Sequence, residues 1–160
     1  MIRLAKMSEV SEIMQVLNLA RLYMHQTGNI HQWDNGYPFI DMVEDDIRSG
    51  QGYVVIKDKK IIGYFAFILG NDPTYAYIED GQWLNNESYG TIHRLGSCER
   101  GGVFHEVMEY CSKISKNIRA DTHADNKIMQ HLFLKEGFQH CGIIYLETGS
   151  PRVAFQFIKS

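Results

Sequence analysis

The stretch IHRLGSCERGGVFHEVMEYC, residues 92–111, joins a strand-like segment to an amphipathic helix through a short glycine turn. Its first residues form an apolar run that is typical of a strand. From Val103 onward, apolar residues recur at helical spacing. Gly101 and Gly102 lie between the two elements, and because glycine has no side chain the backbone there is accessible. This junction predicts a mixed α/β fold in which a strand leads directly into a helix N-terminus.

That helix N-terminus is a candidate anion site. The first N–H groups of a helix have no partner within the helix, and the helix dipole favours negative charge there. The two glycines would let a phosphate come close, and Arg100 adds a cation beside them. The simpler interpretation is a tight turn with an exposed arginine, because a lone Gly-Gly pair is neither a Walker loop nor a GxGxxG motif. The glycines alone favour that simpler interpretation.

Outward from this junction, the hydrophobic periodicity predicts further strands and helices. Ser8 is expected to cap the first helix and Gly28 to end it, and Gly50 and Gly137 are expected to end two later helices. The expected order is strand, helix, helix, four strands, helix, strand, helix, strand and strand. The strands are expected at residues 2–5, in a hairpin at 53–69 with its turn at 58–60, and at 75–80, 91–97, 118–123, 140–148 and 152–158.

Length and composition exclude several classes of protein. The chain has 160 residues, of which 44% are hydrophobic and 22% charged, and this suits one domain over residues 1–160 with a buried core. The formal net charge of -3 gives no electrostatic reason to bind nucleic acid or an anionic membrane. No apolar run approaches the roughly 20 residues of a membrane span, and the N-terminus lacks the apolar core of a signal peptide.

The cysteines and histidines indicate neither disulfides nor a metal. Three cysteines without a CxxC motif are typical of reduced thiols in a cytoplasmic protein. The histidines show no paired ligand spacing for zinc. Asp121, Asp125 and Asn126 are hard-metal ligand types, but capping of the next helix explains them more simply. No metal is therefore expected.

Several segments together resemble the GNAT superfamily, the Gcn5-related N-acetyltransferases. The resemblance covers nearly the whole chain. It is carried by IRLAKMSEVSEIMQVL, the hairpin YVVIKDKKIIGYFAF, IHRLGS, IRADTHADNKIMQHLFLKEGF and CGIIY. It implies an α+β fold with one mixed, mostly antiparallel central sheet flanked by helices. It also implies an acetyl-CoA-dependent N-acetyltransferase, and family habit suggests a homodimer in which the hairpin extends the sheet.

The resemblance also implies which residues bind acetyl-CoA. The arm of the cofactor would pair with the strand backbone at Leu95, Gly96 and Ser97, and Asn126 would contact it. The pyrophosphate would lie on the turn, which is shorter than the usual family turn and has a phenylalanine in place of its last small residue. Phe133 occupies the position at which many relatives have a tyrosine that protonates the leaving thiolate. The residues expected at the cofactor are Leu95, Gly96, Ser97, Arg100, Gly101, Gly102, Val103, Phe104, Asn126, Phe133 and Lys135.

Acetyl transfer to an amine needs a base, because a free alkyl amine is mostly protonated at neutral pH. His93 is the first candidate, since it precedes the turn and alternates with Leu95 and Ser97 along the strand. The alternative is a histidine bonded within the sheet. His123 is a second candidate base. Tyr145 is a candidate acid, although such a tyrosine more often packs its ring and bonds its hydroxyl locally.

The acceptor side is predicted from aromatic residues in loops, where specificity usually resides. Trp33, Tyr37 and Trp83 suggest a small amphipathic or apolar amine, and Glu79 could pair with its positive charge. The equally favoured alternative is that these aromatics seal a small core under long loops. The alternative function is a non-catalytic acyl-CoA-binding module or sensor of the same fold, and a third is a homologue that keeps only the fold.

Overall fold

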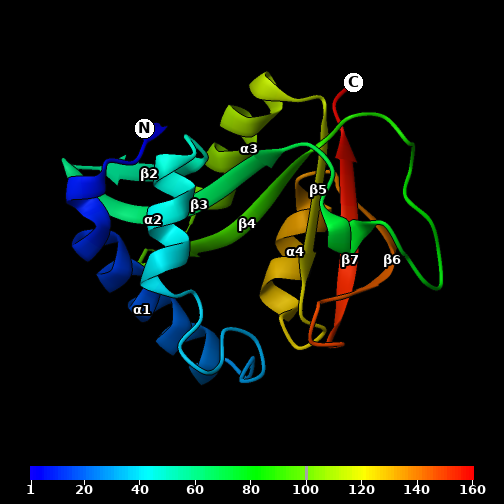
Figure 1. Cartoon of the computed structure of the whole chain (residues 1–160), viewed down its shortest axis with the longest axis horizontal. Coiled ribbons are helices and arrows are strands. Elements are labelled where there is room, and N and C mark those ends of the chain that lie inside the picture. The colour runs from blue at the N-terminus through cyan, green and yellow to red at the C-terminus, as the bar shows by residue number, and fades with distance from the viewer. Residues whose placement is uncertain (100) are drawn as a thin grey trace.

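One seven-stranded sheet runs through the molecule (Figure 1), and the computed structural model describes residues 1–99 and 101–160. The strand order is β1-β2-β3-β4-β5-β7-β6. Every neighbouring pair is antiparallel except β4 and β5, which are parallel. The strands are β1 (Ile2–Leu4), β2 (Gly52–Lys57), β3 (Lys60–Leu69), β4 (Gly90–Ser97), β5 (Asn117–Thr122), β6 (Gln139–Tyr145) and β7 (Pro151–Ile158).

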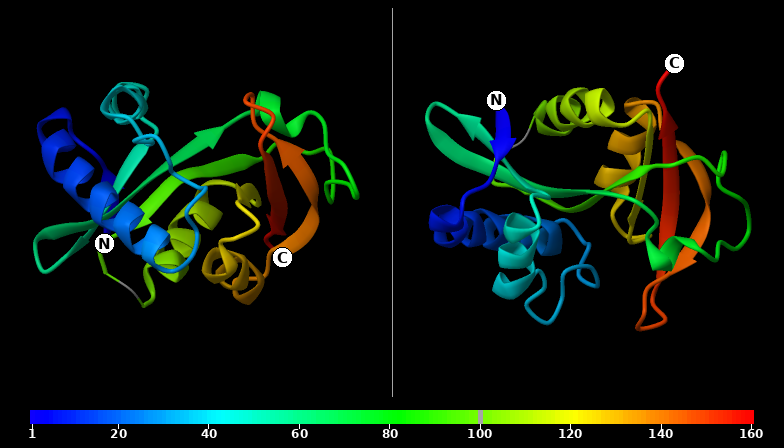
Figure 2. Two further views of the ribbon diagram at one scale, coloured as in Figure 1. Left: turned by 90° about the horizontal axis from the view of Figure 1, so that it is seen from below. Right: turned by 45° about the horizontal axis from the view of Figure 1, so that its top comes forward.

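Helices cover both faces of this sheet (Figure 2). The four α-helices are α1 (Val10–Gln26), α2 (Ile40–Arg48), α3 (Val103–Ile114) and α4 (Lys127–Lys135). One core lies between α1, α2 and the first face of β2 and β3, and the other lies between α3, α4 and the opposite face. The predicted α+β class, with a mixed, mostly antiparallel sheet flanked by helices, is confirmed. Among the described residues, no helix is both long enough and apolar enough to cross a membrane.

The first helix begins differently from the prediction. Ser8 is not an N-cap, because it lies inside a 3-10 turn, η1 (Met7–Glu9), that precedes α1. The Glu9 carboxylate accepts a hydrogen bond from the backbone N–H of Lys6 at 2.8 Å, and Arg3 donates to the same carboxylate. This carboxylate satisfies the exposed N–H at the helix entry, so no serine cap is needed. Gly28 follows the helix with a φ of 96°, as predicted for its end.

The hairpin of β2 and β3 is confirmed, with its turn at residues 58 and 59. Asp58 and Lys59 have φ angles of 51° and 65°. Two successive positive φ angles match the right-handed twist of the flanking strands, which is why such turns favour hairpins. The charged turn and the β-branched residues around it were sufficient to predict this element.

The predicted strand at residues 75–80 is wrong. Asp72 instead caps a 3-10 turn, η2 (Pro73–Tyr75), by accepting from the Thr74 N–H. Tyr75 is 2% exposed and packs in a small core with Tyr89, Ile144 and Ala154. Only Glu79 forms a β-bridge, with Ile143 of β6. Tyr75 therefore fills a core beneath the loop between β3 and β4, whereas Tyr77 is exposed, and the segment does not form a ladder.

Strands β4 and β5 separate after a short contact. Their ladder has two pairs, Gly90 with Ile118 and Thr91 with Arg119. Beyond those pairs β4 continues against β3, while β5 continues against β7 (Figure 1). The opening between them faces the loop that connects α1 to α2, and the sheet there offers an unpaired strand edge.

Candidate active site

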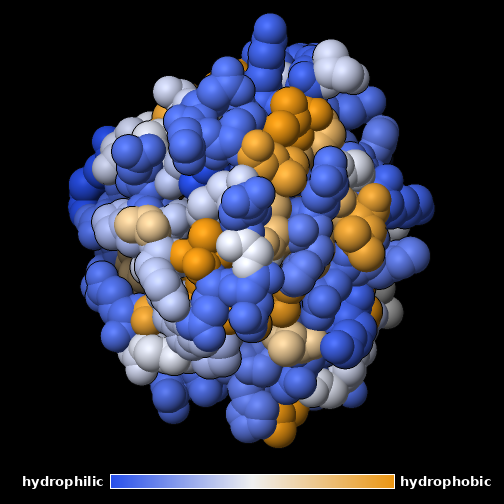
Figure 3. Space-filling view, turned by 90° about the vertical axis from the view of Figure 1, so that its right-hand side faces the viewer, coloured by the Kyte–Doolittle hydropathy of each residue, from blue (hydrophilic) through white to orange (hydrophobic). Residues whose placement is uncertain are grey.

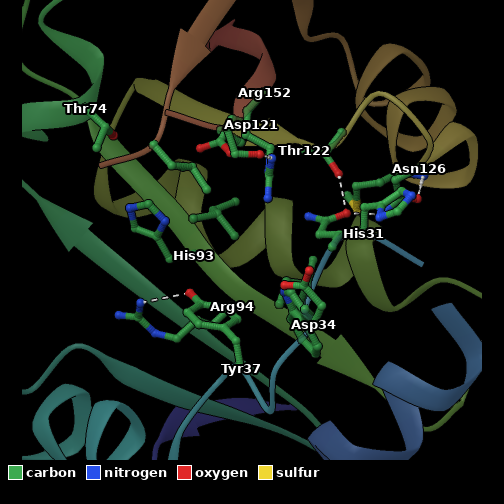
Figure 4. A pocket seen from close by; sticks show the side chains of 18 of the residues that line it. His31, Asp34, Tyr37, Thr74, His93, Arg94, Asp121, Thr122, Asn126 and Arg152 are labelled. Carbon is green, nitrogen blue, oxygen red and sulfur yellow. Dashed lines mark hydrogen bonds between the residues drawn. The ribbon is translucent and has the colours of Figure 1, made fainter. Parts of the chain in front are cut away.

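A cavity of about 980 Å³ lies where β4 and β5 separate. Its walls include Ile92 to Leu95 of β4 and Ala120 to Thr122 of β5. The lining also includes residues of the α1–α2 loop, the start of η2, one side of α4, the β6–β7 turn and Arg152 of β7. Figure 4 shows His93 and Arg94 on one side, with Asp121, Thr122 and Arg152 across from them. Several segments distant in sequence therefore meet at one site.

A β-bulge in β4 shapes the wall beside this opening. Ala66 of β3 is paired with His93, whereas Tyr64 is paired with Gly96, so two residues of β4 lie opposite one of β3. Arg94, within the bulge, has a φ of 53°. The bulge moves Ser97 to the face opposite His93, because a bulge shifts the alternation by one residue. The expectation that His93 and Ser97 share one side of the strand is therefore wrong.

A buried ion pair anchors the bulge to α2. Arg94 donates two hydrogen bonds to the Asp46 carboxylate, from Nε at 2.9 Å and from Nη2 at 2.7 Å. The Tyr64 hydroxyl donates to the same carboxylate at 2.7 Å. Burial alone would disfavour the Arg94 cation, but Asp46 outweighs it and raises the arginine pKa. Burial and the adjacent carboxylate likewise raise the pKa of Tyr64. The cluster fixes the backbone immediately after His93.

His93 has a carboxylate partner within the cavity. Its Nε2 lies 2.8 Å from Asp72 Oδ2. Burial pushes the pKa of Asp72 upward, but hydrogen bonds from His93 and Thr74 outweigh burial and lower it to about 2. An ionised carboxylate only accepts hydrogen bonds, so Nε2 donates to Asp72, and in a neutral ring Nδ1 is the nitrogen with the lone pair. Nδ1 has no hydrogen bond to any described residue, and the His93 ring lines the cavity.

Beside this pair lies a second carboxylate. The Tyr75 hydroxyl donates to Asp121 Oδ2 at 2.6 Å. Burial raises the pKa of Asp121, and the tyrosine hydrogen bond partly offsets that effect. The Tyr75 ring lies 6.4 Å from the His93 ring, between centroids. The mini-core under the long loop therefore supports the same wall of the cavity that carries His93.

The glycine turn is open to solvent. Gly101 and Gly102 have φ angles of 91° and 80°, and a Cβ atom at either position would meet nothing within 4 Å. Gly102 is the N-cap residue of α3, and Val103 begins the helix. Phe104 is buried and packs edge-on against Phe133. Arg100 lies outside the described residues.

Of the other residues expected at the cofactor, Leu95, Asn126 and Phe133 line the cavity, and Gly96, Ser97 and Lys135 lie outside its lining. Leu95 lines the cavity, and Gly96 packs so closely on α1 that a Cβ would lie 2.9 Å from Leu17. The Ser97 hydroxyl donates to the Ile62 carbonyl at 3.0 Å. Phe133 lines the cavity from α4 and is 3% exposed, and Lys135 is exposed at the end of that helix.

Asn126 is held by a hydrogen-bonded junction with the α1–α2 loop. Its Oδ1 accepts from the Met129 N–H and caps α4. Its Nδ2 donates to Gln32 Oε1 at 3.2 Å, and Thr122 donates to the same oxygen at 3.2 Å. Gln32 therefore connects the loop to both β5 and α4, on the rim of the cavity.

The structure brings only some of the expected acceptor residues to the cavity. Trp33 is 7% exposed and lines it together with Tyr37. Trp83 lies outside the lining, and its Nε1 donates to the Tyr75 carbonyl at 2.9 Å. Glu79 also lies outside and accepts from the Tyr77 hydroxyl at 3.0 Å. Trp83 thus fits the alternative interpretation of a small core under a long loop.

The two other candidate catalytic residues also lie outside the cavity lining. His123 Nδ1 accepts from the Asp125 N–H at 3.0 Å, which engages that nitrogen within a turn. Burial and nearby Arg152 lower the pKa of His123. The Tyr145 ring stacks on Tyr77 at 6.4 Å between centroids, at the end of β6 and outside the lining. Of the three candidates, the structure brings His93 alone into the lining.

Sequence reasoning missed four polar residues of the site: Asp72, Arg94, Asp46 and Arg152. Asp72 lies 21 residues from His93, and Asp46 lies 48 residues from Arg94. Only Asp72 had a local signal, because Asp-Pro precedes a turn. Among residues 1–99 and 101–160, no three histidine, cysteine, aspartate or glutamate side chains group as metal ligands. The described cysteines are free thiols.

Solved structures show what the chain is similar to. An acetyltransferase of the GNAT family from Streptococcus agalactiae 2603 is 35% identical, with a TM-score of 0.90 over 100% of this chain and 95% of that one. A putative acetyltransferase from Staphylococcus aureus Mu50 is 29% identical, with a TM-score of 0.69 over 99% and 98% of the two chains.

More distant structures share the fold alone. The NatB acetyltransferase complex bound to CoA and MES is 11% identical, with a TM-score of 0.68 over 100% of this chain and 99% of that one. No model of a protein family matches the chain, and no curated protein matches it.

Figure 3 shows the side of the molecule that lies on the right in Figure 1. This face is mostly hydrophilic, with hydrophobic side chains in a few small groups.

Proposed function

Since the chain belongs to the GNAT family of N-acetyltransferases, we propose that its donor is acetyl-CoA and that its acceptor is the amine of a small molecule. The observation that carries this proposal is the His93–Asp72 pair, which lies in a cavity at the opening between β4 and β5. A histidine with a free nitrogen beside an unpaired strand edge is suited to amine acylation.

The residues around the opening fit an acyl-CoA. The β4 edge beyond Thr91 has free backbone groups with which an amide-containing arm can pair. The open turn at Gly101 and Gly102 presents the N-terminus of α3, which favours a pyrophosphate. We therefore propose Leu95 and Gly96 for the arm and the glycine turn for the phosphates. When bound, acetyl-CoA supplies an acetyl thioester, whose carbonyl carbon is the electrophile.

His93 would then act as the general base. The acceptor ammonium gives one proton to His93 Nδ1, and the neutral nitrogen attacks the carbonyl carbon. As the C–N bond forms and the C–S bond breaks, the attacking nitrogen releases its second proton to water. Asp72 holds Nε2–H and stabilises the resulting imidazolium. A backbone N–H of the β4 bulge is suited to the oxyanion, because Arg94 and Asp46 hold that backbone rigidly.

The leaving thiolate needs no tyrosine on α4 in this scheme. Phe133, at the position where the family often has tyrosine, lies in an aromatic cluster and has no proton to give. A thiol has a pKa of about 8.5 against about 10.4 for an alkyl amine, so the thiolate leaves more readily than the amine. We propose that it then takes a proton from His93 or from water.

The walls of the cavity favour a small acceptor. Trp33 is buried, and the Tyr37 carbonyl accepts from Arg21 at 3.1 Å, which holds the α1–α2 loop down. The β6–β7 turn contributes Leu146, Glu147, Thr148 and Ser150 from the opposite side. An acceptor amine would thus be surrounded from both sides, as small-molecule pockets are.

Thermal unfolding with acetyl-CoA tests the proposed site of the donor. Acetyl-CoA at roughly 100 Kd should stabilise the native protein by about 2.7 kcal/mol, or roughly 5 to 10 °C. Gly102→Glu is expected to abolish this shift, because the carboxylate would occupy and repel the phosphate position.

Gly50→Glu is the matched control. Gly50 has a φ of 69°, and a Cβ atom added there would meet nothing within 4 Å. It follows the end of α2 and is absent from the cavity lining. Both variants carry the same kind of backbone strain, so only the loss of the ligand shift separates them. A native protein with no shift would contradict the proposal. Saturable binding of acetyl-CoA, with no CoA released in the presence of any amine, would instead support the non-catalytic module.

A further inference from the structure

Arg152 of β7 is a buried cation whose hydrogen-bond acceptors in the described part of the chain are neutral. Its side chain lines the cavity, and the residue is 8% exposed. Its Nη1 donates to Ser150 Oγ at 2.6 Å and to the Pro151 carbonyl at 2.8 Å, both neutral acceptors. In the part of the chain that the structure describes, no carboxylate oxygen lies within 4.0 Å of its guanidinium. Arg94, in the same cavity, is by contrast fully paired with Asp46.

The charges around Arg152 leave it undercompensated. Burial lowers its pKa, and Asp121 and Asp34 act against that effect only from a distance. The Asp121 carboxylate is already bonded to the Tyr75 hydroxyl. A desolvated guanidinium without a bonded anion is costly, and a carboxylate or phosphate would use its remaining donors. Figure 4 shows Arg152 beside Asp121, across the cavity from Tyr37 and Arg94.

We propose that the acceptor is an amine that also carries an oxyanion, a carboxylate or a phosphate, and that Arg152 binds this group. The inference rests on the proposed function, because it assigns the second end of the same acceptor. His93 and Asp72 receive the amine, while Arg152 receives the anion from the other wall. A small amino acid has both groups on one molecule.

This arrangement orients the acceptor as well as binding it. An arginine fork holds a carboxylate or phosphate through two parallel hydrogen bonds, which restricts rotation of the ligand. The amine is then directed toward His93 Nδ1 and the β4 edge. The ammonium is also favoured by Asp72 and Asp34, which lie in the lining. The two ends of the cavity thus complement the two charges of an amino acid.

The test compares acceptors in matched pairs. Alanine, phenylalanine and methionine are each assayed beside the amine that lacks the carboxylate, and O-phosphoethanolamine is assayed beside ethylamine. For the native protein, kcat/KM should be about 10- to 100-fold higher for the anionic member of a pair. Preference within the amino acid pairs identifies a carboxylate, and preference for the phosphoamine identifies a phosphate.

Arg152→Gln should remove the preference, with kcat/KM falling mainly for the anionic member of each pair, whereas Arg152→Lys should retain part of the preference. Arg119→Gln is the matched control, because Arg119 is a buried arginine that lies over the Trp83 and Tyr89 rings outside the cavity. Calorimetry with N-acetylalanine and N-ethylacetamide gives a readout without turnover. Only the first should bind the native protein, and Arg152→Gln should lose it.

The outcomes separate this inference from the proposed function. Equal use of both members of every pair, with acetyl-CoA still bound and turned over, would overturn the role of Arg152 alone. An Arg152→Gln variant that keeps the preference would do the same, and Arg152→Lys decides the case if the glutamine variant unfolds. Failure of the native protein to bind acetyl-CoA would instead contradict the proposed function.

Discussion

His93→Gln is expected to lower kcat by about 10²- to 10⁴-fold, the usual loss when a general base is removed. Glutamine can still donate to Asp72, so the hydrogen bond at 2.8 Å has a substitute while the proton acceptor is lost. The variant should also depend on free amine in solution. Its rate should therefore keep rising with pH toward the pKa of the acceptor, and a pH series of initial rates measures this.

His140→Gln is the control for this prediction, because His140 is exposed on β6 and absent from the cavity lining. Asp72→Asn should lower kcat with little change in the KM for acetyl-CoA. The amide would donate to Nε2 and so place the proton on Nδ1, the wrong nitrogen for a base. A loss of less than threefold for His93→Gln at every pH would show that His93 is not the base.

Asp46→Ala should have the largest effect on stability, a loss of about 3 to 5 kcal/mol, because it leaves Arg94 as a buried and unpaired cation. Urea unfolding followed by circular dichroism measures it. Asp45→Ala is the matched control on the same helix. Asp45 is 77% exposed at its side chain, and its substitution should change stability by less than about 0.5 kcal/mol.

The double variant Asp46→Leu with Arg94→Met separates charge from packing. Removing both charges should be much milder than removing Asp46 alone, because the buried ion pair also carries a desolvation cost. If Asp46→Ala lowers the free energy of unfolding by less than about 1 kcal/mol, the Asp46–Arg94 pair is more solvated than the structure indicates. If the double variant folds but loses kcat, the ion pair serves to hold the bulge beside His93.

Local sequence patterns were sufficient to predict the elements that depend on residues adjacent in the chain. The β2–β3 hairpin followed from its charged turn, and the ends of α1 and α2 followed from Gly28 and Gly50. The segment 75–80 was misassigned because aromatic residues have the same local signature whether they enter a ladder or fill a core. The burial of Tyr75 beneath the loop depends on tertiary contacts with residues of β6 and β7, which lie far away in the sequence.

The site was predicted in part for the same reason. His93 could be proposed because a histidine just before the turn has a local context. Its partner Asp72 and the buried Arg152 belong to other elements, and only the meeting of β4, β5 and β7 brings them together. Trp83 and Glu79 lie outside the lining because the loop between β3 and β4 packs against β6.

The bulge in β4 divides that strand into two segments whose side chains alternate out of step with each other. Residues up to His93 follow one alternation of inward and outward side chains, and residues from Gly96 follow the opposite one. The alternation of inward and outward side chains is therefore interrupted within Gly90–Ser97, so hydrophobic periodicity identifies this strand poorly. Deleting one residue of the bulge would restore a regular ladder and keep the flanking residues opposite their present partners, whereas pairing every residue of β4 in turn would put one half of the strand on the wrong face. The register of β4 therefore limits which insertions and deletions in this strand the fold can accommodate.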